Sequence, residues 1–303
     1  MAKYVVKRIL LAIVSILIVS AIAFFAMNAI PGGPFNKEKA SSPAVQAELE
    51  KRYNLDKPVG EQYILYMNNL LHGDWGVSLK TGRDIWTDIS SKFAVSAQLG
   101  GKAALVAIIS GIILGSIAGL TRNRLPDRLI VFFTTLGTAM PSFVLATLLM
   151  LVFCQKLGWF PVWSSSNPNY VLPIIALALY PMAYITRLTK TSMLDALNQD
   201  YIRTARAKGV AGWKVIFVHA LRNALIPVIT YVGPMVAYIL TGSMVVENIF
   251  TIGGLGSSFV TSITNRDYTT IMATTIFLAI LMVIANLLTD IAYKLVDPRI
   301  TLE

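Results

Sequence analysis

Six long apolar segments lie along the chain, and the polar stretches between them hold most of the charged residues. The apolar segments cover about residues 9–30, 103–120, 129–153, 171–186, 224–246 and 271–292. A run of about 20 apolar residues is long enough to cross the roughly 30 Å hydrocarbon core of a bilayer as a helix. The pattern therefore predicts an all-α polytopic membrane protein with six transmembrane helices.

The distribution of basic residues predicts how these helices are oriented. The N-terminus carries three basic residues and no acidic one, residues 121–128 carry three arginines, and residues 187–222 carry seven Lys and Arg against two Asp. Residues 31–95, by contrast, hold eight basic and eight acidic residues. Because an excess of Lys and Arg marks cytoplasmic loops, both termini are predicted to be cytoplasmic. The formal net charge of +10 then mostly reflects topology, and nucleic-acid binding is not needed to explain it.

Composition narrows the class further. The chain is 55% hydrophobic and 14% charged, whereas soluble domains have about 25% charged residues. Cys154 is the only cysteine, and His72 and His219 lie far apart, so neither an internal disulfide nor a cysteine metal cluster is expected. The first apolar run is too long for a signal sequence and lacks a small-x-small cleavage site, so we expect it to be a retained first span.

Ionisable residues are scarce in the predicted spans and lie near their ends. Lys102, Glu247 and Asp290 are the examples, and Asp290 is placed to pair with Lys294 one helical turn later. The lack of a mid-span carboxylate disfavours a carrier driven by protons or sodium. The chain has no G-x-x-x-x-G-K-[ST] sequence for its own nucleotide site, and no H-E-x-x-H or G-x-S-x-G sequence. An intramembrane enzyme is disfavoured because no set of candidate catalytic residues is found.

Residues 31–95 are predicted to form a small packed external subdomain. Ser42 and Pro43 form a good helix start, and the helix is expected to run to about Tyr53. A second helix is expected over about residues 61–71, and H-G-D-W-G at residues 72–76 predicts a turn after it. A second glycine-rich stretch, G-G-L-G-S-S at residues 253–258, is expected to be a turn or a partly inserted loop.

Gly111, Gly115 and Gly119 follow one another at four-residue spacing in the second span. Such a row of small residues lets the backbone of a second helix approach closely. A static packing contact is favoured over a contact that moves during transport.

The basic block D-Y-I-R-T-A-R-A-K-G, residues 200–209, is the most informative polar stretch. Its residues favour a helix, and Gly209 suits the left-handed position that follows a helix C-terminus. The surface around Ile202, Ala205 and Gly209 is small enough to sit in a groove of a partner protein, where the basic side chains could meet acidic groups. The alternative is a helix lying on anionic headgroups. The scarcity of Leu, Phe and Trp in the block favours the partner.

This block, followed by H-A-L-R-N-A-L-I-P at residues 219–227, resembles the cytoplasmic loop of the permease subunit of bacterial ABC importers. More specifically, it resembles the B-type subunit of the oligopeptide, dipeptide and nickel group. Of the general E-A-A-x-x-x-G form of that loop, only Ala205 and Gly209 are kept. The resemblance extends over nearly the whole chain, through I-P-G-G-P-F at 30–35, Y-N-L-D-K-P-V-G-E-Q-Y at 53–63, L-L-H-G-D-W-G-V-S at 70–78, V-V-E-N-I-F-T-I-G-G-L-G at 245–256 and N-L-L-T-D-I-A-Y-K-L-V-D-P-R-I at 286–300. Two positions depart from the group's pattern, with Gly33 in place of the usual Asp and Gly253 in place of the common Pro.

The resemblance implies the type I ABC importer permease fold and a division of the chain into four parts. These are a first transmembrane helix at 1–30, an external subdomain at 31–95, a five-helix core at 96–296 that includes a cytoplasmic coupling loop at 188–222, and a cytoplasmic tail at 297–303. It also implies a non-catalytic subunit in the bacterial cytoplasmic membrane that forms half of a translocation pathway for oligopeptides.

The partners implied by the resemblance are a homologous second permease, two ATP-binding subunits and an external peptide-binding protein. No cofactor would be bound by this chain, because ATP and Mg²⁺ would belong to the ATP-binding subunits. The helix at about 200–209 would dock on one of those subunits, and Ala205 and Gly209 are the best candidates for contact. The residues expected at this contact are Tyr201, Ile202, Arg203, Ala205, Arg206, Lys208 and Gly209.

Two alternatives stay open from the sequence. An importer of the same group could carry dipeptides, nickel or another small solute, because the external receptor largely selects the substrate. A less favoured alternative is an ATP-independent carrier or channel. The two classes differ in one requirement, since only the importer needs ATP-hydrolysing partner subunits.

Overall fold

The computed structural model describes residues 2–30 and 56–296, with side chains for residues 6–30 and 56–290. The helix expected from Ser42 to about Tyr53 lies outside the described residues. In the part that is described, the chain is helical without a β-strand; only an isolated bridge joins Val77 and Asp84.

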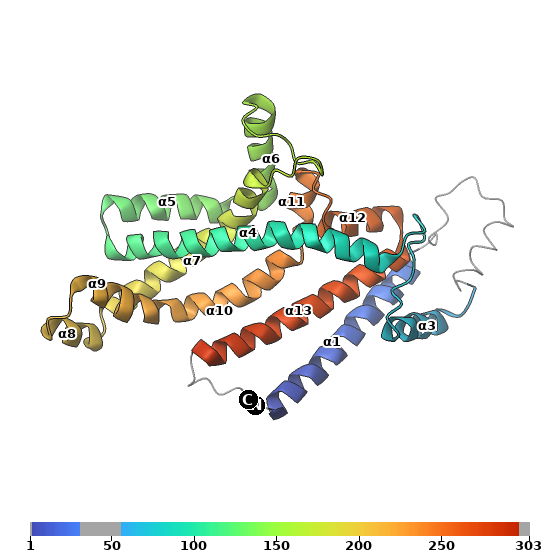
Figure 1. Cartoon of the computed structure of the whole chain (residues 1–303), viewed down its shortest axis with the longest axis horizontal. Helices are drawn as coiled ribbons and strands as arrows, with labels where there is room; N and C mark the ends of the chain where they lie inside the picture. Colours follow the sequence, from blue (N-terminus) through green and yellow to red (C-terminus); the bar gives the residue numbers. More distant parts are fainter. Residues whose placement is uncertain (1, 31–55, 297–303) are drawn as a thin grey trace.

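Long helices run along the molecule, and shorter ones lie at its two ends and project from its side (Figure 1). The elements are α1 (Ala2–Ala29), α3 (Val59–Leu71), α4 (Ile85–Leu120), α5 (Leu125–Ala139), α6 (Ser142–Leu149), η1 (Met150–Lys156), α7 (Val171–Leu197), α8 (Asp200–Ala207), α9 (Gly212–Lys214), η2 (Val215–Ala220), α10 (Leu221–Leu240), α11 (Met244–Ile249), α12 (Leu255–Asn265) and α13 (Tyr268–Val296). By length and composition, five helical segments could cross a membrane, and a bent pair makes a sixth if it forms one span.

That bent pair corrects the expected third span. Residues 129–153 are expected to form one transmembrane helix, but α5 ends at Ala139 and the axis turns by 103° before α6 begins at Ser142. Pro141 explains the break, because proline has no amide hydrogen for the helix and disfavours helical dihedrals in the preceding residue. Met140 is accordingly extended, with φ −83° and ψ 125°.

The fifth span is also interrupted. The expected segment 224–246 contains the end of α10 at Leu240 and the start of α11 at Met244. Between them Gly242 has φ +94°, which is in the region that favours glycine.

Two predicted domain limits fall inside helices of the structure. The predicted end of the external subdomain at residue 95 lies within α4, which begins at Ile85, and the predicted start of the coupling loop at residue 188 lies within α7, which extends to Leu197.

The core of the bundle is formed by α4, α7 and α10, and α4 contacts α7 through its row of glycines. A Cβ atom at Gly111 would lie 2.7 Å from Cγ2 of Ile185, and one at Gly115 would lie 2.5 Å from Cβ of Thr189. At Gly119 it would lie 3.0 Å from Cβ of Met193. The two helix backbones therefore approach to a distance that any larger side chain would prevent.

Glycines also mark the contacts of α10 with its other neighbours. A Cβ at Gly100 of α4 would lie 2.6 Å from the carbonyl oxygen of Ile239, and a Cβ at Gly233 would lie 2.1 Å from Cγ2 of Thr289 on α13. Small and branched side chains fill the space between these helices; the buried set is Ala103, Ala104, Ala107, Ala178, Ile185, Val228, Met235 and Ile239.

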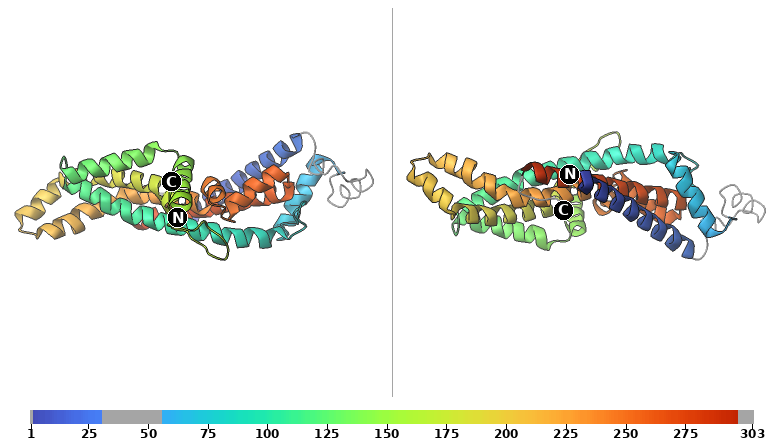
Figure 2. Two further views of the ribbon diagram at one scale, coloured as in Figure 1. Left: turned by 90° about the horizontal axis from the view of Figure 1, so that it is seen from above. Right: turned by 90° about the horizontal axis from the view of Figure 1, so that it is seen from below.

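Helix α1 lies beside α13 at the edge of the bundle (Figures 1 and 2). Phe24 and Met27 of α1 pack in one cluster with Met272 of α13. Near the other end of the pair, Arg8 forms an ion pair of 2.7 Å with Asp290. The sequence predicts a pair between Asp290 and Lys294, whose side chain lies outside the described residues, and the structure adds Arg8 as a partner from a different helix.

A buried polar network closes the end of the bundle at α11 and α12. The side chain of Glu247 is 0% exposed, and its Oε1 accepts a hydrogen bond of 2.7 Å from the Ser96 hydroxyl of α4. Its Oε2 accepts one of 2.9 Å from the amide of Ser257, and the Ser96 oxygen accepts one of 2.8 Å from the amide of Leu255. Both amides belong to the first turn of α12, which carries the positive end of the helix dipole. The glycine-rich stretch 253–258 is thus the start of a helix that Glu247 caps.

At the same end, the turn predicted at residues 72–76 is present, with φ +84° at Gly73 and +80° at Gly76. The segment after it is attached to the start of α13 by Asp267, which is buried. Asp267 accepts hydrogen bonds from the Ser78 hydroxyl, at 2.5 Å, and from the Leu79 amide, at 3.0 Å.

Replacement of Gly115 by alanine should lower the thermal unfolding midpoint of the purified protein in detergent. The added methyl group would also lie 2.6 Å from the carbonyl oxygen of Thr186, so the backbone must move, and overpacking of this kind costs about 1–3 kcal/mol. Gly101→Ala is the matched control, because it lies on the same helix and its Cβ would meet nothing within 4 Å. Equal midpoints for the two variants would contradict the close contact between α4 and α7.

Candidate functional site

The basic block of residues 200–209 lies at one end of the molecule, beyond the ends of the long helices (Figures 1 and 2). It forms α8, which the short α9 and η2 connect to α10. Asp200 lies in the first turn of α8 and Arg206 in the last, which is the arrangement that a helix dipole favours.

Gly209 ends α8 as the sequence predicts. Its φ is +74°, and its amide donates to the carbonyl of Arg206 at 3.0 Å. The next amide, that of Val210, donates to the carbonyl of Ala205 at 3.1 Å. This pair of hydrogen bonds is the Schellman arrangement, which satisfies two carbonyls at a helix C-terminus and requires a residue in the left-handed conformation.

The inner face of α8 packs against its own chain. Ile202 is 0% exposed and Ala205 is 9% exposed, and they share a cluster with Met193 of α7 and with Ala220 and Ala224 at the start of α10. The expectation that Ile202 and Ala205 present a small surface to a partner is therefore wrong for this structure. The reason is that the only apolar face of this strongly amphipathic helix is needed to cover the ends of α7 and α10.

This correction changes what a substitution at Ala205 reports. If Ala205 faced a partner, Ala205→Glu would place a charge in that partner's cleft. In the structure, a glutamate there would place an unpaired carboxylate among Ile202, Met193 and Ala224, so it would first disturb the attachment of α8 to the bundle.

The outer face of α8 is exposed and strongly basic. The residues that form it are Tyr201, Arg203, Thr204, Arg206, Ala207 and Lys208. Among the described residues, the acid that pairs with this face is Asp200, which is itself 94% exposed and lies 3.5 Å from the guanidinium of Arg203. An exposed ion pair of this kind contributes little to the stability of the protein. The outer face is therefore suited to a partner surface with acidic groups.

Asn223 adds a polar link between α8 and α10. Its side-chain amide donates to the hydroxyl of Tyr201 at 3.2 Å and to the carbonyl of His219 at 2.8 Å. Sequence reasoning did not single out Asn223. Its position in H-A-L-R-N-A-L-I-P, one helical turn before Pro227, is the sequence feature that could have indicated it.

An ion pair fixes the same end of α7 to α5. The carboxylate of Asp127 is buried and lies 2.5 Å from Nζ of Lys190, and its second oxygen accepts from the amide of Asn123 at 2.9 Å. Lys190 lies one turn before Met193, which contacts α8 through the cluster described above. Helix α7 is thus held on two sides where it meets α8.

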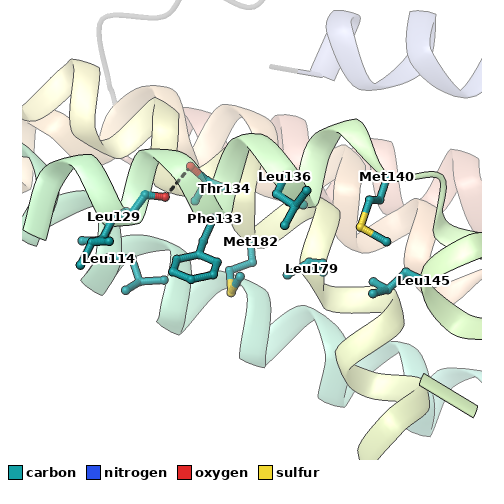
Figure 3. A pocket seen from close by; sticks show the side chains of 11 residues that line it. Leu114, Leu129, Phe133, Thr134, Leu136, Met140, Leu145, Leu179 and Met182 are labelled. Carbon is teal, nitrogen blue, oxygen red and sulfur yellow. Dashed lines mark hydrogen bonds between the residues drawn. The ribbon is translucent and has the colours of Figure 1, made fainter. Parts of the chain in front are cut away.

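A pocket of 320 Å³ lies between α4, α5 and α7, beside the bend at Pro141 (Figure 3). Its lining is apolar apart from Thr134, whose hydroxyl donates to the carbonyl of Ile130 in the same helix at 2.8 Å. The pocket therefore offers almost no free hydrogen-bonding group to a polar solute. The described residues also contain no group of three His, Cys, Asp or Glu side chains that could hold a metal ion.

Two family models match the chain. Residues 111–302 match the model described as "Binding-protein-dependent transport system inner membrane component", and residues 1–99 match the corresponding N-terminal model. Two curated relatives match over nearly their whole lengths. The dipeptide transport system permease protein DppB of Bacillus subtilis is 47% identical over 100% of this chain and 99% of the relative. The oligopeptide transport system permease protein OppB of Salmonella typhimurium is 41% identical over 99% of each.

Solved structures show the same fold at low sequence identity. An amino acid ABC transporter chain covers 69% of this chain with a TM-score of 0.56 and 14% identity. A chain of the MetNI methionine ABC transporter, in an inward-facing conformation, covers 69% with a TM-score of 0.54 and 14% identity. The structures therefore have a helical core in common with this chain, and the remaining residues of this chain lie outside that core.

Replacement of Gly209 by alanine should open the C-terminal end of α8. A left-handed conformation costs a residue with a side chain about 1–2 kcal/mol, so the opened population should rise about five- to thirty-fold. Trypsin cleavage after Arg206 and Lys208, both exposed, should accelerate accordingly. Gly212→Ala is the control, because Gly212 does not have a positive φ and its Cβ would meet nothing within 4 Å. Equal cleavage rates for the two variants would show that Gly209 is not required for the cap.

Proposed function

This chain belongs to the family of binding-protein-dependent transport system inner membrane components, and on that premise we propose how it receives energy and from which partners. It is a membrane-embedded permease subunit of an ABC importer for peptides, as the matches to oligopeptide and dipeptide permeases over nearly full length indicate. We propose that it forms half of the pathway for oligopeptides and that α8 is the helix on which ATP-hydrolysing subunits act.

The construction of α8 is the observation that supports this role. Its inner face is buried against the ends of α7 and α10 through Ile202 and Ala205, and its outer face presents Arg203, Arg206 and Lys208 to the surroundings. A force on the outer face would therefore move two membrane-spanning helices together, because α8 is packed on both of them. A helix on a flexible loop would not transmit such a force.

The partners follow from the family and from what this chain lacks. The sequence contains no G-x-x-x-x-G-K-[ST] motif, so ATP and Mg²⁺ are assigned to two partner ATP-binding subunits rather than to this chain. A homologous second permease completes the pathway. An external peptide-binding protein delivers the substrate, in keeping with the description of the family as binding-protein-dependent.

Energy coupling then has a simple thermodynamic requirement. The permease has two states, with inward and outward access. ATP can shift the equilibrium between them only if the ATP-binding subunits in their closed, ATP-bound form bind one permease state more tightly than the other. The contact at α8 supplies this difference if the cleft that receives α8 changes shape when ATP binds. An importer of dipeptides or nickel would also need α8 to dock on ATP-binding subunits. A carrier or channel without ATPase partners would not need this contact.

Reversal of the outer charges of α8 should separate ATP hydrolysis from transport. We expect Arg203→Glu combined with Arg206→Glu to lower peptide uptake by at least about tenfold, because like charges at a docking surface cost several kcal/mol. The complex with its partner subunits, in proteoliposomes, should still hydrolyse ATP. Both quantities are measured on the same preparation.

Arg128→Glu serves as the matched control, because Arg128 is also exposed, belongs to a predicted cytoplasmic loop and lies on α5 instead of α8. Its uptake should stay near that of the unmodified complex. Normal uptake by the double variant would contradict docking through the outer face. Loss of uptake with retained ATP hydrolysis would support it.

A further inference from the structure

Part of the exposed surface of α7 and of α10 is polar, although Val171, Ile175 and Ile226 on these helices are exposed as well. From Tyr180 onward, the exposed residues of α7 are Tyr180, Tyr184, Arg187, Thr191 and Asp195. On α10, a second exposed row consists of Asn223, Pro227, Thr230, Pro234 and Tyr238. The spacing is the same in both rows, at steps of four, three, four and four residues, which keeps each row on one face of its helix.

The two rows meet to form one surface, the α7–α10 polar face. The rings of Tyr184 on α7 and Tyr231 on α10 are in contact and tilted, with their centroids 4.2 Å apart and an interplanar angle of 31°. Tyr231 is partly buried and lies beside the exposed row of its own helix. Tyrosines from both helices are thus gathered at the junction of the rows.

The contrast with α4 shows that this face does not point toward lipid. Over residues 105–120 every exposed side chain of α4 is apolar; these are Leu105, Val106, Ile109, Ile113, Ile117 and Leu120. On the polar face, Tyr180, Tyr184 and Tyr238 are 53%, 39% and 72% exposed, and no hydrogen bond to their hydroxyls is found among the described residues. Such groups are costly in hydrocarbon, where nothing satisfies them.

A proline adds an acceptor to the same surface. Pro227 is exposed and lies inside α10. Because proline has no amide hydrogen, the carbonyl of Asn223, four residues earlier in the helix, loses its usual donor. Backbone groups freed in this way within a membrane must be satisfied by other protein groups or by water in a cavity.

We propose that the α7–α10 polar face is the wall of the translocation pathway on this subunit, and that Tyr184, Tyr231 and Tyr238 contact the peptide in transit. This inference rests on the proposed function, because the occupant is the substrate of the importer. Tyrosine rings pack on side chains of many kinds, and their hydroxyls donate to and accept from peptide amides. The freed carbonyl of Asn223 accepts from an amide group of the peptide. Recognition of this kind depends on the peptide backbone and tolerates different side chains.

The same face is attached to α8. Asn223, the first residue of the α10 row, donates to the Tyr201 hydroxyl of α8, and α7 and α10 both pack on α8 through the Ile202 cluster. Movement of α8 therefore moves the wall directly. The competing occupant of this face is the second permease subunit, and the experiment below separates the two.

The single native cysteine makes a labelling test clean. In a Cys154→Ser background, Tyr184→Cys and Tyr238→Cys are introduced separately, and Leu105→Cys and Ile113→Cys on the apolar face of α4 serve as controls. Each variant is assembled with its partner subunits in proteoliposomes and treated with a charged, membrane-impermeant methanethiosulfonate reagent. We expect the two tyrosine positions to react at least about tenfold faster than the controls, because only a thiol in water ionises readily.

The second arm of the test adds a peptide that the complex imports, together with the external binding protein. Labelling at positions 184 and 238 should slow at least threefold, and labelling at positions 105 and 113 should not change. Slow labelling at all four positions would overturn the proposal and assign the face to the second permease. Rapid labelling that the peptide leaves unchanged would also overturn it, because the face would then line water without touching substrate.

Failure of the importer assignment itself would look different. A complex that imports no peptide, with or without ATP, would refute the proposed function, and the labelling pattern without peptide would still show whether the face lines a water-filled path.

Tyr184→Phe is a further control, because the cysteine variants could misfold. This substitution keeps the ring and removes one hydroxyl. Peptide uptake should therefore fall severalfold, while ATP hydrolysis and the yield of the complex stay unchanged.

Discussion

The close approach of α4 and α7 is the contact on which the rest of the structure depends. Helices in a bilayer gain little from leaving lipid for one another, so their association rests on packing and on polar contacts. Gly111, Gly115 and Gly119 make this packing possible, because no side chain separates the two backbones at these points. Gly119 faces Met193, and Met193 in turn contacts α8. The glycine row therefore determines where the end of α7 lies and, through it, where α8 is held.

The site has two surfaces that are physically connected. One is the basic outer face of α8, and the other is the polar face of α7 and α10. The Ile202 cluster and the hydrogen bond from Asn223 to Tyr201 join them. The ion pair between Asp127 and Lys190 secures the same end of α7 to α5. Removing one partner of a buried ion pair destabilises a protein by several kcal/mol, so α5, α7 and α8 are firmly connected at this end. A subunit without a nucleotide site of its own needs such a connection, because it must transmit movement from its partners.

Much of the fold could be predicted from the apolar segments, because about 20 uncharged residues in a row have few structural alternatives. Helix α8 and its terminal glycine could be predicted from residues 200–209 for the same local reason. The direction in which Ile202 and Ala205 point could not be predicted, because it depends on α7 and α10, which lie beside α8 only in the folded chain. The ion pair between Asp290 and Arg8 could not be predicted either, since Arg8 is distant in sequence. The break at Pro141 was visible in the sequence, but its angle of 103° was not.

The network around Glu247 has a consequence for the order in which the protein is assembled. Ser96 is 151 residues from Glu247 and 159 residues from Leu255, so none of these hydrogen bonds can form until most of the chain has been synthesised. At about 5–20 residues per second, residue 255 follows residue 96 by roughly 8–30 s. During that time the earlier spans must stay associated without the network. The carboxylate of Glu247 is thus buried in one of the last steps of biogenesis, which completes that end of the bundle only after the remaining helices are in place.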